Sequence, residues 1–321
     1  APQPPGYLRE AVYHTYRSRQ WSGLDVSSVE PEPLPPAAEH PEGWLAFGVG
    51  PPVGMQAART HWRLRYLRPR RVLSLCLSGS VRAILLPEGL DPVVSADGIV
   101  TLAEDEVPAE VRAVLESGPG DPAYPWPDPQ LQEAYRTVPA PLAAAVSNWV
   151  DQCEGLASAE DVAVARRALV RHFHRGFRYA LGKPPPSGEP LVAFMAEREG
   201  HCTLFASACT LMLRSRGIPA RVVGGFYCTE QHRYTGRWMV RARDAHAWCE
   251  AWDSAAGRWV RIEATPPGGL PDAHAPPGHL RLLWEALASA GRRLLDRLRS
   301  SSPLALLAAG LALVSDVFWS G

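Results

Sequence analysis

The chain has 321 residues, of which 46% are hydrophobic, so it is long enough for two domains with at least one sizeable core. Its 33 basic and 33 acidic side chains cancel to a net charge of zero. This balance excludes the basic surplus that is typical of nucleic-acid-binding proteins, and we expect no nucleic-acid partner.

Residues 1–116 are predicted to form a small β-rich domain. Several segments show the spacing of apolar side chains that is typical of strands, namely residues 7–21, 60–67, 71–79 and 81–89. The clearest is "THWRLRYL" (60–67), which alternates apolar and polar residues as a half-buried strand does. Near the end of this domain, "PAEVRAVLES" (108–117) is predicted to be a short helix.

Residues 117–157 are predicted to be a linker followed by a helix. The linker begins with the Pro-rich stretch "SGPGDPAYPWPDP" (117–129), and the helix is "APLAAAVSNWV" (140–150). A longer helix is predicted over 158–177, with Ser158 as its N-cap and Asp161 completing a variant of the capping box. Its apolar residues keep to one helix face, at positions 162, 165, 169 and 173.

Residues 158–275 are predicted to form a second domain in which helices precede an antiparallel sheet. After the helix at 158–177, two more helices are expected at 191–199 and 202–216, the latter ended by Gly217. Four strand candidates follow, at residues 220–228, 237–242, 245–252 and 258–264. Within the first of them, Gly224 and Gly225 predict a close passage of a neighbouring backbone. This order of elements predicts the α+β class.

Cysteines occur at positions 76, 153, 202, 209, 228 and 249, and no two of them form a CxxC pair. A structural zinc site is therefore not predicted, and we expect neither a metal ion nor a cofactor. Cys202 differs from the others because it lies at the start of a predicted helix, where free N–H groups and the helix dipole favour a thiolate. Cys209 lies two turns further into the same helix and is expected to be an ordinary buried thiol.

Two further residue types would complete a thiol active site. His246 in "DAHAWCEAW" stands at the head of a predicted strand, where its imidazole could take the proton of Cys202 and return it to a leaving group. If Trp252 pairs with Trp259 across a hairpin, Glu263 becomes a diagonal neighbour of His246. Glu250 is the rival carboxylate because it shares the parity of His246, whereas Asp244 is expected to cap the turn.

Three motifs in the order Cys, His, acid resemble those of the transglutaminase-like superfamily of papain-type thiol enzymes. They are "GHCTLFASACTLMLRSRGIPARVVGGF", "DAHAWCEAW" and "RWVRIEATPP", and they span about residues 165–268. The resemblance implies a papain-like core of helices packed on an antiparallel sheet. It also implies Cys202 as nucleophile, His246 as base and Glu263 as the orienting acid, where the family more often has Asp. His201 stands where the family commonly has an aromatic residue. It could modulate the charge of the Cys202 thiolate or simply face water, and we expect the second.

The resemblance implies acyl transfer on protein or peptide amides through a thioester. Two alternatives stay open at this point: a cysteine protease or deamidase that uses water, and a non-catalytic peptide-binding or scaffold module. A weaker resemblance of "YLREAVYHTYRSRQW" (7–21) to bacterial membrane-anchored transglutaminase-like proteins implies an extracytoplasmic catalytic domain.

The C-terminal segment, residues 276–321, suggests membrane association. Residues 279–300 are amphipathic and Arg-rich, as expected of a helix lying on a membrane surface. Residues 303–314 are apolar but shorter than the ~20 residues that a spanning helix requires. We expect either membrane association through residues 279–314 or a helix packed on the catalytic domain. Because the chain begins at Ala1 and not at Met, we also expect a mature form or a piece of a longer protein.

Overall fold

Two units make up the chain: residues 1–229 with 240–274, called the main unit here, and residues 230–239 with 275–321. The computed structural model describes residues 4–271 except 25–27, 30, 32–33, 35–41, 49–57, 66–72, 78–80, 103–109, 118–128 and 183–186, together with 282–283 and 286–287. In the second unit, β15 (Glu230–Gln231) and β16 (Trp238–Met239) pair as a short antiparallel hairpin.

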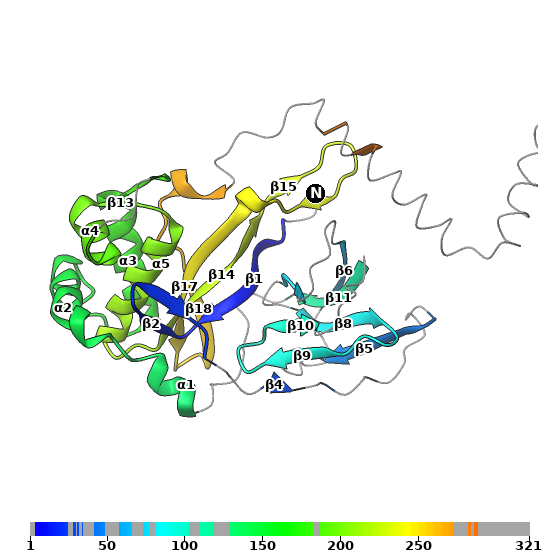
Figure 1. Cartoon of the computed structure of the whole chain (residues 1–321), viewed down its shortest axis with the longest axis horizontal. Coiled ribbons are helices and arrows are strands. Elements are labelled where there is room, and N and C mark those ends of the chain that lie inside the picture. Colours follow the sequence, from blue (N-terminus) through cyan, green and yellow to red (C-terminus); the bar gives the residue numbers. More distant parts are fainter. Residues whose placement is uncertain are drawn as a thin grey trace, which may run out of the picture. The chain divides into compact units, whose positions relative to one another are not determined.

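The main unit is built on a four-stranded antiparallel sheet in the order β1-β14-β17-β18 (Figure 1). Its strands are β1 (Gly6–Tyr13), β14 (Ala220–Cys228), β17 (Ala245–Asp253) and β18 (Arg258–Ile262). The last three match strands predicted from the sequence. Strand β1 was expected in the β-rich N-terminal domain, but it hydrogen-bonds to β14. An apolar pattern identifies a strand but does not show which strand it pairs with, so this pairing could not be predicted. The three boundaries between the four predicted segments stay a prediction.

Two glycines allow β1 to approach β14 closely. A Cβ atom on Gly225 would lie 1.9 Å from the carbonyl oxygen of Leu8, a distance that no side chain tolerates. On Gly224 it would lie 3.2 Å from the ring of Tyr13. The β1–β14 register shifts opposite these glycines, between Arg9 and Ala11, as at a β-bulge. The predicted close backbone passage is confirmed.

Helices gather on one side of the central sheet (Figure 1). They are α2 (Ala143–Gln152), α3 (Val162–Gly176), α4 (Pro190–Glu197) and α5 (Cys202–Ser215). Helix α1 (Pro129–Ala134) packs its Leu131 against Trp252 and Trp259 on the other face of the sheet. Helix α5 is buried along most of its length, and its residues share one apolar core with Cys249 and Ala251 of β17. Helices on one face of an antiparallel sheet form the predicted α+β core.

Helix α3 begins later than the sequence suggested. Its N-cap is Asp161, whose Oδ1 accepts a hydrogen bond of 2.7 Å from the backbone N–H of Val164. The predicted N-cap, Ser158, is wrong because Asp161 already has the extended backbone of a cap and supplies the acceptor itself. The predicted apolar face is confirmed, since residues 162, 165, 169 and 173 are all buried.

A β-rich region precedes the helices and contains two further four-stranded sheets. One has the order β4-β9-β10-β7 and the other β5-β8-β11-β6. Their strands are β4 (Ser28–Val29), β5 (Trp44–Gly48), β6 (Ala58–Arg65), β7 (Leu73–Ser74), β8 (Val81–Pro87), β9 (Pro92–Ser95), β10 (Val100–Leu102) and β11 (Glu110–Ser117), while β2 (Thr15–Arg17) and β3 (Gln20–Ser22) form a hairpin. The predicted helix at 108–117 is wrong, because β11 pairs with β6 and β8 on its two sides. Pairing on both edges overrides the high helix propensity of its Glu, Ala and Leu residues.

A buried ionic cluster joins β1, the β9–β10 turn and the central sheet. It consists of Arg9, His14, Asp97, Arg221 and Glu250, each less than 5% exposed. Asp97 accepts from His14 Nε2 at 2.7 Å and from Arg221 Nη1 at 2.9 Å, and it also accepts the Tyr135 hydroxyl. Arg221 in turn donates to Glu250 at 2.7 and 2.9 Å. The charges of the cluster are therefore paired, as burial of ionised groups requires.

The segment predicted to associate with a membrane, residues 279–314, lies almost entirely outside the described residues. Among the residues that the structure does describe, no helix has the length and apolar character needed to cross a bilayer.

Candidate active site

Cys202 is the first residue of α5, as predicted. Its N-cap, His201, has an extended backbone and makes no side-chain capping bond. The two residues before it form β13 (Glu199–Gly200), which runs parallel to β12 (Arg178–Tyr179). A Cβ on Gly200 would lie 2.7 Å from the side chain of Leu204 and 2.8 Å from that of Phe194, so a larger residue would require these side chains to move. The sulfur is thus fixed at a helix N-terminus, where the dipole favours negative charge.

The surroundings of the Cys202 sulfur favour the thiolate. Burial alone would raise the pKa of this thiol, but hydrogen bonds from His201 and His246, the charge of His246 and the backbone N–H of Ala247 lower it to about 6. Of the two roles considered for His201, both are seen in part: the residue is exposed, and its side chain also hydrogen-bonds to the Cys202 sulfur and lowers the thiol pKa.

His246 is buried at the head of β17 and contacts both predicted partners. Its Nε2 lies 2.8 Å from Oε2 of Glu263, which leaves Nδ1 for the sulfur of Cys202. Burial opposes protonation of the ring, but the hydrogen bonds to Cys202 and Glu263 and the charges of both raise the pKa of His246 to about 9. Between these pKa values, Cys202 and His246 form a thiolate–imidazolium pair.

The strand register that placed Glu263 beside His246 is confirmed. Trp252 pairs with Trp259, and the ladder continues to the pair of Cys249 with Ile262, one residue before Glu263. The structure therefore brings together all three residues that the sequence singled out.

The other two carboxylates near His246 in the sequence are engaged elsewhere. Glu250 accepts from Arg221 within the buried ionic cluster and from Trp248 Nε1 at 3.3 Å. Asp244 accepts from the backbone N–H of Arg241 at 2.7 Å, which is the turn-capping role expected of it.

Sequence reasoning missed three residues that complete the site. The Tyr7 hydroxyl donates to Glu263 Oε2 at 2.8 Å, and the backbone N–H of Thr265 donates to Oε1 at 2.8 Å. The hydroxyl of Tyr179 hydrogen-bonds to Cys202, and burial followed by the charge of Cys202 raises the Tyr179 pKa to about 12. Tyr7 lies within residues 7–21, the segment that carries the weaker family resemblance. The spacing of residues in a strand, however, does not show which tyrosine will contact a carboxylate far away in the sequence.

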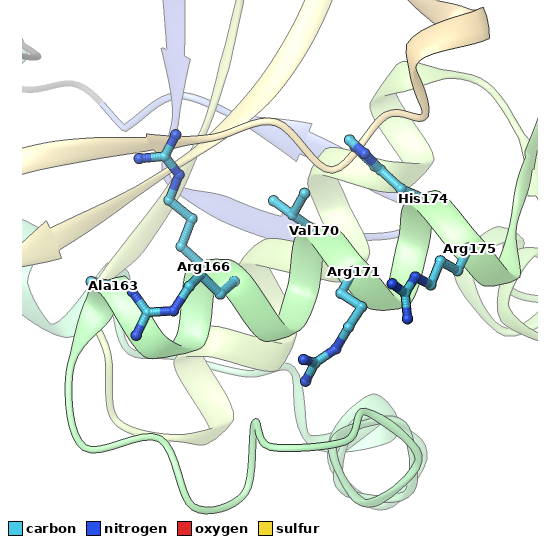
Figure 2. Close-up of a pocket in the computed structure, with 7 residues that line it drawn as sticks. Ala163, Arg166, Val170, Arg171, His174 and Arg175 are labelled. Atoms are coloured by element: carbon cyan, nitrogen blue, oxygen red, sulfur yellow. The ribbon is translucent and has the colours of Figure 1, made fainter.

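A hollow elsewhere on the main unit is separate from this site. It has a volume of ≈ 510 Å³ and runs along one face of α3 (Figure 2), lined by Ala163, Arg166, Arg167, Val170, Arg171, His174 and Arg175. None of Cys202, His246 and Glu263 lines it. Its link to the site is His174, whose Nε2 lies 3.2 Å from the backbone carbonyl oxygen of Glu263.

The thiolate–imidazolium pair predicts a distinct alkylation profile. We expect iodoacetamide to modify Cys202 first, with a rate that rises as pH increases through about 6. Cys209 should resist, because it is fully buried and burial, with the neighbouring Cys249, raises its pKa. Peptide mapping of a time course at several pH values measures both. A midpoint at the ~8.5 of a free thiol, or faster labelling of Cys209, would contradict the assignment.

A cysteine at a helix N-terminus facing a His–carboxylate pair on an antiparallel sheet is the arrangement of papain-type thiol enzymes, and the fold is papain-like. Residues 149–264 match the family model described as the transglutaminase-like superfamily. The chain therefore carries a transglutaminase-like domain and is similar to bacterial proteins that contain one.

Two curated relatives are similar over this domain. A protein-glutamine gamma-glutamyltransferase of Pseudomonas aeruginosa is 34% identical over 110 residues, which are 34% of this chain and 16% of that protein. The uncharacterised protein YebA of Bacillus subtilis is 38% identical over 71 residues, 21% of this chain and 9% of that protein. The chain thus matches less than a fifth of the length of either relative.

A solved structure extends the likeness in fold beyond the domain. The periplasmic domain of TgpA from Pseudomonas aeruginosa, in a crystal structure bound to ethylmercury, superposes with a TM-score of 0.52 at 20% identity. The superposition covers 85% of this chain and 88% of that one. The shared architecture therefore includes the β-rich region as well as the helices and central sheet.

Proposed function

We propose that the chain catalyses acyl transfer from protein or peptide amides, with Cys202 as nucleophile, His246 as general acid and base, and Glu263 as the orienting carboxylate. The observation that carries this proposal is the hydrogen-bonded series from the Cys202 sulfur through His246 to Glu263. A sulfur with a pKa of about 6 is ionised at neutral pH, while the adjacent imidazolium still holds a proton to deliver.

The reaction follows from these protonation states. The thiolate attacks the amide carbonyl carbon and forms a tetrahedral intermediate, whose C–N bond breaks as His246 protonates the departing nitrogen. Ammonia or an amine leaves, and a thioester to Cys202 remains. His246, now neutral, takes a proton from an incoming amine or water, which attacks the thioester and expels the thiolate.

Donors around the sulfur can also stabilise the oxyanion. The backbone N–H groups of the first turn of α5 point toward the helix N-terminus, where a developing negative charge is favoured. The Ala247 N–H and the Tyr179 hydroxyl already bond the sulfur, so they lie next to the reacting carbon.

An amine is the acceptor we favour, because the relative from Pseudomonas aeruginosa is named as a glutamyltransferase. Water as acceptor would make the chain a protease or deamidase. The test is the mass of a glutamine-containing peptide incubated with the protein, with and without an added primary amine. Transfer predicts a product carrying the amine, hydrolysis predicts deamidated or cleaved peptide in both samples, and an unchanged peptide would point to the non-catalytic scaffold.

We further propose an extracytoplasmic location with membrane association through residues 279–314. The likeness to a periplasmic domain and the amphipathic, Arg-rich pattern of residues 279–300 support it. Residues 1–275 alone are expected to stay unbound in a flotation assay with anionic lipid vesicles, whereas the full chain floats. Equal behaviour of the two proteins would favour a C-terminal helix packed on the catalytic domain.

A further inference from the structure

The Glu263 carboxylate receives three hydrogen bonds, one of which comes from a residue 256 positions away. Oε2 accepts from His246 Nε2 and from the Tyr7 hydroxyl, both at 2.8 Å, and Oε1 accepts from the Thr265 N–H. The same oxygen atom is therefore shared by the imidazole and the phenol. Any rotation of the carboxylate that loses one of these donors also disturbs the other.

The Tyr7 side chain is itself held in place on several sides. Its ring packs edge-on against Trp248 at 5.1 Å and lies 4.6 Å from the ring of Tyr227, its register partner on β14. The Arg261 guanidinium covers the ring at 3.9 Å. Burial, then the charge of Glu263, raises the pKa of Tyr7 above its ordinary value, so the hydroxyl remains protonated and can only donate to this carboxylate.

We propose that Tyr7 is a positioning residue of the active site: its hydroxyl fixes the Glu263 carboxylate and thereby the orientation of the His246 ring. This role rests on the proposed function of the His246–Glu263 pair. Glutamate has one more rotatable bond than the aspartate usual in the family, so its carboxylate needs more restraint. Strand β1, and not the motifs around Cys202 and His246, supplies that restraint.

The test compares two Tyr→Phe variants of the full chain by the pH dependence of Cys202 alkylation. Tyr7→Phe keeps the packed ring and removes only the donor to Glu263. The matched control is Tyr16→Phe, which deletes a tyrosine–glutamate hydrogen bond of the same kind, 2.5 Å to Glu189, away from His246. Thermal unfolding of both variants measures how much stability each protein loses with its tyrosine–glutamate hydrogen bond.

Tyr7→Phe is expected to narrow the pH range over which Cys202 and His246 form a thiolate–imidazolium pair. A less well placed carboxylate stabilises the imidazolium less, so the His246 pKa falls, and the thiolate then loses part of its stabilisation. We expect the acid midpoint of alkylation to rise by about 0.5–1 pH unit in Tyr7→Phe and to stay at the wild-type value in Tyr16→Phe. An unchanged midpoint in Tyr7→Phe, or an equal rise in both variants, would overturn the proposal.

A double variant shows whether Tyr7 acts through Glu263. In the Glu263→Gln background the carboxylate charge is gone, so adding Tyr7→Phe should move the midpoint little further. Additive shifts would mean that Tyr7 acts by another route, and the proposal would fail. Alkylation requires no substrate, so this result stands apart from the peptide assay: a chain without acyl-transfer activity could still show the Tyr7 effect.

Discussion

Cys202→Ala should abolish thioester formation and lower the turnover of a glutamine peptide by about 10⁴-fold or more, because the sulfur that forms the thioester is removed. His246→Ala should cost a similar factor, since an unactivated thiol without a proton donor cannot expel an amine. Glu263→Gln should lose less, because that carboxylate only orients and stabilises the ring. Steady-state kinetics with the peptide and a primary amine measure all three.

The matched control is Cys209→Ala, which removes a buried thiol from the interior of the same helix. It should keep turnover near the wild-type value while lowering the melting temperature, since it leaves a small cavity. The effects of mutating residues that act as one catalytic unit are not additive. The turnover of the double variant Cys202→Ala/His246→Ala should therefore be no lower than that of either single variant. Substantial turnover by Cys202→Ala would refute the assignment of the nucleophile.

Asp97→Ala is expected to destabilise the fold by about 3–5 kcal/mol, because it removes one of the two buried carboxylates, Asp97 and Glu250, that offset the charges of Arg9 and Arg221. Asp97 is 2% exposed and bonds both His14 and Arg221. Denaturant unfolding measures the loss. The control is Asp151→Ala on the exposed surface of α2, which should change stability by no more than about 0.5 kcal/mol. A loss of that small size for Asp97→Ala would contradict the account of the ionic cluster.

The same cluster predicts an acid-sensitive stability. Burial opposes ionisation of Asp97, but the hydrogen bond and charge of His14 and the charge of Arg221 hold its pKa well below the usual value. A depressed pKa in the folded state contributes stability above the unfolded value of ~3.9, and that contribution is lost as pH falls below it. Wild-type stability should therefore fall more steeply than that of Asp97→Ala below about pH 4.

Local sequence patterns were enough to predict the elements that position Cys202, His246 and Glu263. The spacing of apolar residues identified α3 and α5, and the hairpin joining β17 and β18 set the register that brings Glu263 to His246. These features depend on neighbours a few residues apart. The position of Cys202 at the start of a helix could also be predicted, because Gly200 and the apolar run that follows it indicate where the helix begins.

Features that depend on residues far away in the sequence could not be predicted from local patterns. Strand β11 was mistaken for a helix because its two neighbouring strands, β6 and β8, decide its conformation. Tyr7 and Tyr179 reach the site only through pairing of β1 with β14 and of β12 with β13. The N-cap of α3 was misplaced for a different reason: Ser158 and Asp161 are both good caps, and only the backbone geometry distinguishes them.

The central claim is that Cys202 forms a covalent acyl intermediate, and intact-protein mass spectrometry during turnover tests it most directly. With a glutamine peptide and no added amine, we expect a species heavier than the protein by the peptide mass less ammonia. Proteolytic mapping should place the adduct on Cys202, and hydroxylamine should release it. Turnover of the peptide with no adduct on Cys202, or with the adduct on another residue, would contradict the account.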